Sequence, residues 1–359
     1  MRAVRVAYTL EQCWHRVPGG TAVAALEVAR ALQEQPDLDL IGVAGRHRGT
    51  PMAGCEPSIP MQYLPFGGAL LYESWMRVSW PKVESVVNAP DLVHATTIIA
   101  PATTRPLVVT LHDLAFLRHP EFFTARGNKI FRRSLEILKK NAQAVLCSSR
   151  ATMTDCVDAG FSASILHHVP LGVNDAPATP SDVQRVRSTY SLPSEYVLFV
   201  GTLEPRKNLA RLVQAHALVV DAPPLVIVGA QGWGNGTPIA SENIIFLGHV
   251  PTADLAALYA AAQALCYPSI LEGFGLPILE AMVQGTPVLT SLATSTEEVA
   301  GNAAVLVDPL DVSAIADGLH RVLARHDELS DLGRAHATTM SWQRTAALTH
   351  GVYTQVCAS

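Results

Sequence analysis

The stretch EGFGLPILEAMVQGTP places two carboxylates, Glu272 and Glu280, around a glycine loop, directly after the apolar run AQALCYPSIL. Pro277 suits the first turn of a helix, because its missing N–H would be unpaired there. Gly273 and Gly275 precede that turn and would let the backbone approach a ligand closely. A helix start of this kind offers N–H donors and a positive dipole end to a phosphate. A phosphate group repels a carboxylate, so Glu280 is better suited to accept hydrogen bonds from the sugar hydroxyls of a nucleotide. The alternative interpretation of this stretch is a left-handed turn beside two solvated glutamates.

A basic pair lies at a similar place earlier in the chain. In VGTLEPRKNL, Arg206 and Lys207 follow a predicted strand and begin a helix. Fixed cations there would stabilise the negative charge of a departing phosphate group without a metal. The alternative is an exposed basic pair, for which the start of a helix is electrostatically unfavourable.

The first half of the chain has two candidate segments of its own. In VVTLHDLAF, His112 and Asp113 end an apolar strand. His112 could hydrogen-bond a sugar hydroxyl or a backbone carbonyl, and Asp113 could orient it or an acceptor. In VPGGTAVAALEVA, Gly19 and Gly20 lie between the first strand and the first helix. A structural histidine and a tight turn are the respective alternatives.

Two further segments resemble sites but lack the required context. IVGAQGWGNG is rich in glycine after a strand, but Pro238 and another strand follow where a dinucleotide site needs a helix. The DLD at residues 37–39 leads directly into a strand and reads as a turn rather than a metal site. We therefore expect neither a dinucleotide cofactor nor a metal.

A basic amphipathic helix is predicted over residues 126–140. Phe131, Leu135 and Leu138 share one face. The charged residues are Arg126, Lys129, Arg132, Arg133, Lys139 and Lys140, against a single acid, Glu136. Such a helix can lie on anionic lipid, although an ordinary helix with its charges in water is the simpler interpretation.

The elements that position these residues form two series. Short apolar runs alternate with helical patterns, which predicts parallel sheets covered by helices. Strands are predicted at 5–10, 38–44, 92–96, 107–113, 144–149 and 165–170, and again at 196–202, 224–230, 243–250, 262–269, 287–291 and 304–309. The loose segment LGVNDAPATPSD between the two series reads as a linker.

The length and composition of the chain agree with two globular halves. The chain has 359 residues, which exceeds the usual size of a single hydrophobic core. A net charge of −5 gives no reason to expect nucleic acid as a partner. The six cysteines are scattered and no run of eighteen apolar residues occurs, so we expect a cytoplasmic protein with reduced thiols and no spanning helix.

Taken together, these segments resemble the retaining glycosyltransferases of family 4, which have the GT-B fold of two Rossmann-like, doubly wound α/β domains facing across a cleft. The resemblance covers nearly the whole chain, including PGGT, VTLHDLAFLRHPE, VLFVGTLEPRKNL, LGHVPTADLAALY, EEVAGNAAVLVDP and the E-x7-E motif that starts at Glu272. It implies an acceptor-side domain over residues 1–174, a nucleotide-sugar domain over 175–340, and a last helix over 341–359 that crosses back to the first domain.

The resemblance also implies a role for each candidate. Glu280 would hold the ribose, the glycine amides would face the diphosphate, and Glu272 would lie near the transferred sugar. Many members carry an arginine where this chain has Thr202, so the diphosphate clamp would depend on Arg206 and Lys207. The implied donor-binding residues are Gly19, Gly20, Gly201, Arg206, Lys207, Gly273, Phe274, Gly275, Leu276 and Glu280, and the implied catalytic residues are His112, Asp113, Arg206, Lys207 and Glu272.

The implied activity is metal-independent, retaining hexosyl transfer to a glycan or lipid-linked acceptor. The pairing of THDLAFLRHPE with GTLEPRKNL is most similar to the bacterial mannosyltransferase branch, which favours GDP-mannose as donor. A UDP-sugar donor is the alternative, either UDP-glucose or UDP-N-acetylglucosamine. An epimerase or hydrolase of the same fold, or an inactive sugar-nucleotide-binding protein, also remains open.

Overall fold

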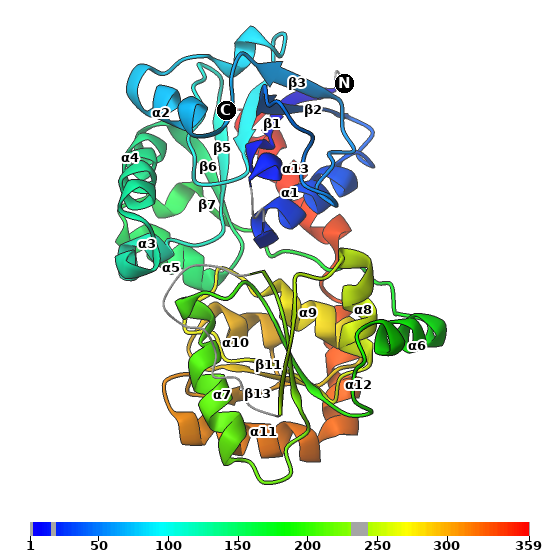
Figure 1. Ribbon diagram of the computed structural model, residues 1–359. Helices are drawn as coiled ribbons and strands as arrows, with labels where there is room; N and C mark the ends of the chain where they lie inside the picture. Colours follow the sequence, from blue (N-terminus) through cyan, green and yellow to red (C-terminus); the bar gives the residue numbers. More distant parts are fainter. Residues whose placement is uncertain (1–2, 16–18, 231–242, 359) are drawn as a thin grey trace. The chain divides into compact units, whose positions relative to one another are not determined.

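The chain forms two compact units in a computed structural model that describes residues 3–15, 19–230 and 243–358 (Figure 1). The first unit comprises Met1–Leu171 together with Trp342–Ser359, and the second comprises Gly172–Ser341. The division therefore falls after Leu171, whereas the sequence placed a boundary after residue 174. The last helix, α13 (Trp342–Ala358), belongs to the first unit.

The first unit is built on a parallel sheet of seven strands in the described residues. In spatial order the strands are β3 (Met61–Leu64), β2 (Leu38–Gly45), β1 (Val4–Thr9), β4 (Leu92–Ala95), β5 (Leu107–Leu111), β6 (Ala142–Cys147) and β7 (Leu166–His168). The strands are short and mostly apolar on both faces, which is typical of a parallel sheet with helices on each side.

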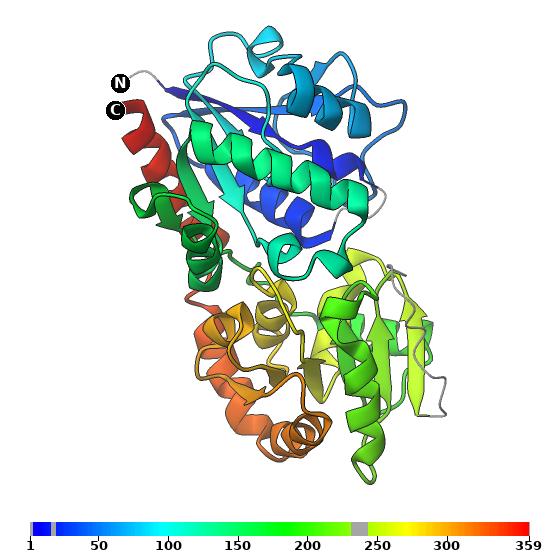
Figure 2. The ribbon, with the colours of Figure 1, turned by 90° about the vertical axis from the view of Figure 1, so that its left-hand side faces the viewer.

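Helices cover both faces of this sheet (Figure 2). They are α1 (Gly19–Leu32), α2 (Gly68–Val78), α3 (Ala115–Arg118), α4 (Ala125–Asn141), α5 (Arg150–Asp158) and α13. The helices α2 and α4 pack against each other on one face, and α1 packs against α13 on the other. The pleat of β1 serves both layers: Ala7 lies in the core under α2 and α4, and the Tyr8 hydroxyl donates to the Ala25 carbonyl of α1.

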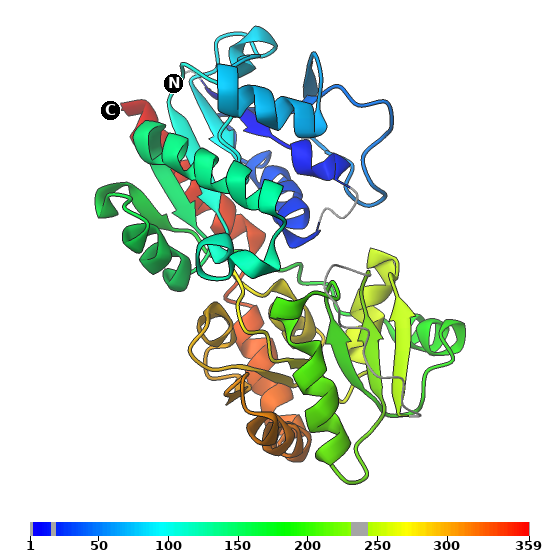
Figure 3. The ribbon, with the colours of Figure 1, turned by 60° about the vertical axis from the view of Figure 1, so that its left-hand side comes forward.

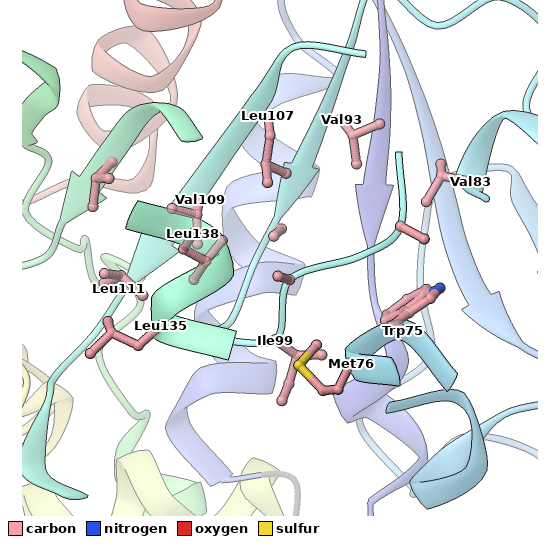
Figure 4. Close-up of a cluster of buried hydrophobic side chains, with 14 of the residues drawn as sticks. Trp75, Met76, Val83, Val93, Ile99, Leu107, Val109, Leu111, Leu135 and Leu138 are labelled. Atoms are coloured by element: carbon pink, nitrogen blue, oxygen red, sulfur yellow. The ribbon is translucent and has the colours of Figure 1, made fainter. Parts of the chain in front are cut away.

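The core between the sheet and the α2–α4 layer is a continuous apolar cluster (Figure 4). It joins Trp75 of α2 and Leu138 of α4 to Val93, Leu107 and Val109 of the strands. These side chains are 3% exposed or less. Burial on this scale stabilises the unit by about 25 cal/mol for each Å² of apolar surface removed from water.

The second unit contains a parallel sheet of six strands in the described residues. In spatial order they are β10 (Ile244–Gly248), β9 (Leu225–Val228), β8 (Val197–Val200), β11 (Ala264–Tyr267), β12 (Val288–Ser291) and β13 (Ala304–Val307). The helices are α6 (Pro180–Thr189), α7 (Leu209–Leu218), α8 (Thr252–Ala260), α9 (Leu276–Val283), α10 (Ser295–Ala300), α11 (Val312–Ala324) and α12 (His326–Ala337), and a 3₁₀ turn, η5 (Pro205–Lys207), precedes α7.

The helices of the second unit also form two layers (Figure 3). The α7–α11 pair packs on one face, where Leu212 and Leu319 meet Phe199 of β8. The other face carries α9 with α8 and α12 beside it. Both sheets therefore have the doubly wound arrangement expected from the sequence, which confirms two Rossmann-like folds.

Strand order identifies where a ligand site should be in the second unit. The order is reversed between β8 and β11, because β9 and β10 lie to one side of β8 and the later strands lie to the other. In doubly wound sheets the crevice at the carboxyl ends of the strands on either side of such a reversal is the usual binding site.

Three local features differ from the sequence expectations. Gly19 and Gly20 are the first residues of α1 rather than a loop before it. The expected linker ends early, because Thr179 caps α6 with a reciprocal capping box and the helix begins at Pro180. Neither α2 nor β3 was predicted from the sequence; β3 has one buried residue in four and hence no period-2 signal.

Gly229 is expected to be indispensable for the fold of the second unit. Its φ is +154°, and an added Cβ would lie 1.9 Å from the Gly201 carbonyl oxygen. Gly229→Ala should therefore cost about 2–4 kcal/mol in the free energy of unfolding, measured by urea denaturation.

Gly351→Ala is the matched control, and its effect on the free energy of unfolding should have the opposite sign. Nothing lies within 4 Å of its Cβ position in α13, so stability should rise by about 0.5–1 kcal/mol. A Gly229→Ala protein as stable as the wild type would contradict the packing described.

Candidate active site

The loops that follow β8 and β11 meet at the strand-order reversal of the second unit. Asn208, in the left-handed conformation with φ 62°, joins them: its side-chain amide donates to the carbonyl of Pro268 at 2.9 Å and to that of Pro309 at 2.6 Å. The Ile270 backbone amide donates to the Arg206 carbonyl at 2.8 Å. These bonds fix η5 against the segment that carries Glu272.

Arg206, Lys207 and Glu272 form one buried ionic cluster. The Glu272 carboxylate bridges both cations, with Oε1 2.6 Å from Lys207 Nζ and Oε2 2.8 Å from Arg206 Nη1. The Lys207 side chain is 10% exposed and that of Glu272 is 6% exposed. The sequence predicted these three residues as catalytic, and the structure brings them into direct contact.

Electrostatics keep the carboxylate of this cluster ionised. Burial alone would raise the pKa of Glu272, but the positive charges of Lys207 and Arg206 outweigh burial and lower it to about 2. An ionised carboxylate and two cations are thus held in a largely desolvated place. Such fixed charges act more strongly than they would in water.

Two residues of the cluster were missed in the sequence. The Tyr267 hydroxyl donates to Glu272 Oε1 at 2.9 Å and accepts from Lys207 Nζ. Glu204 Oε1 lies 2.7 Å from Arg206 Nη2. Tyr267 ends the apolar strand β11, where a tyrosine reads as core. Glu204 stands in the motif EPRKN itself, and its position next to the basic pair was the available signal.

The glycine loop begins α9 as predicted. Gly275 is its N-cap with φ 107°, and Pro277 lies in the first turn. The side chains of Phe274 and Leu276 are buried, so these two residues can offer a ligand only their backbone groups. The helix start directs amide donors and its positive end toward this loop.

Glu280 lies on α9, apart from the ionic cluster. Its Oε2 accepts a hydrogen bond from the Tyr259 hydroxyl at 2.8 Å. Burial raises the pKa of Glu280, partly offset by this hydrogen bond. Tyr259 of α8 was also missed, and it fixes the position of the carboxylate expected to bind ribose.

In the first unit, His112 follows β5 and is held through its backbone. Its carbonyl accepts from Thr152 Oγ1 at 2.8 Å and from Ser148 Oγ at 3.1 Å. Burial lowers the pKa of the His112 imidazole, against the opposing charge of Asp113. The side chain lines a cavity of about 20 Å³, together with Thr96, which is room for about one water molecule. A pKa lowered from the ordinary 6.5 favours the neutral imidazole at pH 7.

The other first-unit candidates take local roles. Asp113 Oδ1 accepts from the Ala115 amide at 3.0 Å at the start of α3. Gly19 has φ 64°, and nothing lies within 4 Å of the position of an added Cβ. In the second unit, Gly201 directly follows β8 with φ 158°, and a Cβ there would lie 3.7 Å from the Lys207 side chain.

The glycine-rich segment IVGAQGWGNG lies largely within residues 231–242, which are outside the described residues. Over the residues that the structure describes, no group of three or more His, Cys, Asp or Glu side chains could hold a metal. In the same residues, no helix combines the length and apolar character needed to cross a membrane.

Comparison with known proteins gives the family. The model described as Glycosyltransferase Family 4 matches residues 18–176, and the model described as Glycosyl transferases group 1 matches residues 182–338. The chain is 32% identical over 281 residues to the O-antigen chain mannosyltransferase B of Escherichia coli, covering 73% of this chain and 74% of that protein. The chain belongs to glycosyltransferase family 4. It is a glycosyltransferase, as the sequence predicted.

Further similarities agree with this assignment. The MMP alpha-(1->4)-mannosyltransferase of Mycolicibacterium hassiacum is 33% identical over 278 residues, which is 70% of this chain and 66% of that protein. The crystal structure of Anabaena Alr3699/HepE with UDP and glucose superposes with a TM-score of 0.77 at 19% identity, covering 98% of this chain and 100% of that one. The latter likeness concerns the fold alone, and the fold is GT-B.

Proposed function

We propose that this glycosyltransferase transfers mannose from GDP-mannose, with retention of configuration and without a metal, to a glycan or lipid-linked acceptor. The observation that supports this most directly is the convergence of Arg206, Lys207 and Glu272 at the strand-order reversal of the second unit. A diphosphate there would meet two fixed cations and the amide donors at the start of α9.

The proposed chemical step uses these groups for part of its work. The bond between C1 of the sugar and the phosphate oxygen breaks, and a bond from the acceptor oxygen to C1 forms on the same face of the sugar. The acceptor proton passes to the departing phosphate oxygen. Arg206 and Lys207 stabilise the negative charge that develops on the diphosphate, in place of a divalent cation.

The names of the relatives support the proposed sugar. Two proteins at least 32% identical to this chain are named mannosyltransferases, which supports mannose as the transferred sugar. A UDP-sugar is the second candidate, because the Anabaena structure that shares this fold contains UDP and glucose.

Product analysis tests this function. The protein would be incubated with GDP-mannose or UDP-glucose, in EDTA, with mannose-terminated and N-acetylglucosamine-terminated glycosides, and the product examined by proton NMR. An α-mannoside is the expected product. A β-mannoside would contradict retention, transfer from UDP-glucose alone would contradict the donor, and free sugar without transfer would favour a hydrolase.

Glu280→Gln is expected to weaken binding of the nucleoside diphosphate by about 10- to 100-fold, since a charged acceptor of ribose hydroxyls becomes neutral. Calorimetric titration with GDP in EDTA measures the effect. Glu328→Gln is the control, because it neutralises an exposed glutamate of the same unit that pairs with Arg325. Equal affinities of wild type and Glu280→Gln would remove Glu280 from the donor site.

We also propose that α4 contacts an anionic lipid surface. Arg132 and Arg133 are exposed on α4 and have no ion pair among the described residues. The neighbouring α2, linked to α4 by the Glu73–Arg126 pair at 3.4 Å, is followed by Trp80, whose side chain is 54% exposed. Basic groups beside an exposed tryptophan suit a membrane interface.

Vesicle sedimentation tests this contact. The double variant Arg132→Glu/Arg133→Glu should lose at least about tenfold in binding to vesicles containing phosphatidylglycerol, at about 1 kcal/mol per basic residue near the surface. Arg325→Glu on the second unit is the control. Wild-type protein that binds these vesicles no better than phosphatidylcholine vesicles would contradict the proposal.

A further inference from the structure

The ionic cluster of the second unit is electrically balanced by its own side chains. Arg206 is engaged at both ends of its guanidinium, with Glu204 2.7 Å from Nη2 and Glu272 2.8 Å from Nη1. Lys207 is paired with Glu272 at 2.6 Å. Two cations thus face two carboxylates. A diphosphate that binds these cations therefore competes with carboxylates already in place.

The two carboxylates differ in what else holds them. Glu272 is shared by Arg206, Lys207 and the Tyr267 hydroxyl. Among the described residues, Glu204 forms an ion pair with Arg206 alone, and its side chain is 3% exposed. Burial raises the pKa of Glu204. The negative charge of Glu272 raises it further, whereas the positive charges of Arg206 and Lys207 act in the opposite direction. The Glu204 carboxylate is therefore the partner that a phosphate oxygen can displace most easily.

Positioning of Arg206 does not require Glu204. The guanidinium is oriented independently by Glu272 and by the Leu271 carbonyl, which accepts from Nη1 at 3.3 Å. The backbone is fixed by the Ile270 amide. The carboxylate of Glu204 is therefore not needed to orient Arg206. It opposes the positive charge of the guanidinium, and its burial costs desolvation free energy that a neutral residue would avoid.

We propose that Glu204 is an internal counter-anion of the phosphate clamp, which the donor's diphosphate displaces from Arg206 and which returns to Arg206 as the nucleoside diphosphate leaves. This role rests on the proposed function and adds a residue that sets how tightly the product is held. Once displaced, the carboxylate is buried without its cation, so it takes up a proton. The groups that face Glu204 during this titration are Arg206, Lys207 and Glu272.

Glu204→Gln tests the role, because glutamine keeps the shape and the oxygen acceptor for Arg206 and removes only the charge. The dissociation constant for GDP, or for UDP if that is the nucleotide bound, should fall at least about tenfold. With saturating acceptor, kcat and KM should both fall because product release becomes slow. Glu204→Asp, which keeps the charge, should stay within about threefold of wild type, and Glu328→Gln, which breaks an exposed glutamate–arginine pair, should leave affinity unchanged.

A second measurement uses the wild-type protein and does not depend on the folding of a variant. The infrared difference spectrum on nucleotide binding should gain the carbonyl band of a protonated carboxyl group. Unchanged or weaker binding by Glu204→Gln, or absence of that band in the wild type, would overturn the counter-anion role alone. Wild-type protein that binds none of GDP, UDP and ADP would instead overturn the proposed function and this role with it.

Discussion

Replacing Lys207 with methionine is expected to slow sugar transfer by about 100- to 1,000-fold, the usual cost of removing one group that stabilises charge in the transition state. Its ammonium is nearly buried and lies 2.6 Å from Glu272, at the edge of the loop that begins α9. The loss should appear mainly in kcat, because charge on the departing diphosphate develops as the sugar bond breaks. Steady-state kinetics with GDP-mannose and a saturating acceptor measure it.

The control for this variant is Arg325→Met, which removes an exposed cation of the same unit. It should transfer sugar at the wild-type rate. A Lys207→Met protein that keeps more than about a tenth of wild-type kcat would show that the leaving group departs elsewhere.

Replacing Glu272 with glutamine is expected to lower the free energy of unfolding by about 3–5 kcal/mol, because two buried cations lose their shared carboxylate. The effect depends on pH in a defined direction. The pKa of Glu272 is about 2 in the folded protein, below the ordinary value of 4.5. Its stabilising contribution is thus complete above about pH 4.5 and is lost as the pH falls toward about 2.

Urea denaturation at pH 7 and at pH 3.5 measures this contribution. The difference between wild type and Glu272→Gln should be largest at pH 7 and smaller at pH 3.5. The double variant Glu272→Gln/Lys207→Met should be more stable than Glu272→Gln, because one unpaired cation is removed with its partner. A Glu272→Gln protein as stable as wild type at pH 7 would contradict the ionic cluster.

Sequence alone predicted the elements with the strongest local signals. Pro277 and the glycines before it predicted the start of α9, and the structure begins that helix at Leu276. The alternation of apolar strands and helices predicted both doubly wound sheets. Each of these signals lies within a short stretch of chain and reflects backbone conformation, which depends on nearby residues.

The partners of the site residues could not be predicted in this way. Tyr267 and Lys207 are separated by 60 positions, and Tyr259 and Glu280 by 21. The first pair arises from strand order, which places β8 beside β11, and the second from the packing of α8 against α9. A buried tyrosine at the end of a strand looks like core until its neighbours are known. The first residues of α1 were misread as loop because glycine is the usual residue of tight turns and is unfavourable within a helix.

The most direct test is a thermal-shift measurement with GDP, UDP and ADP, each with magnesium and with EDTA, on wild type and on Glu280→Gln. A ligand that binds only the folded protein adds about 2.7 kcal/mol of stability at a hundredfold excess over its dissociation constant. We predict that GDP raises the melting temperature of wild type equally with and without magnesium, and that Glu280→Gln loses most of this shift. No shift with any of the three nucleotides, or a shift that requires magnesium, would contradict a metal-free nucleotide-sugar site at Arg206, Lys207 and Glu280.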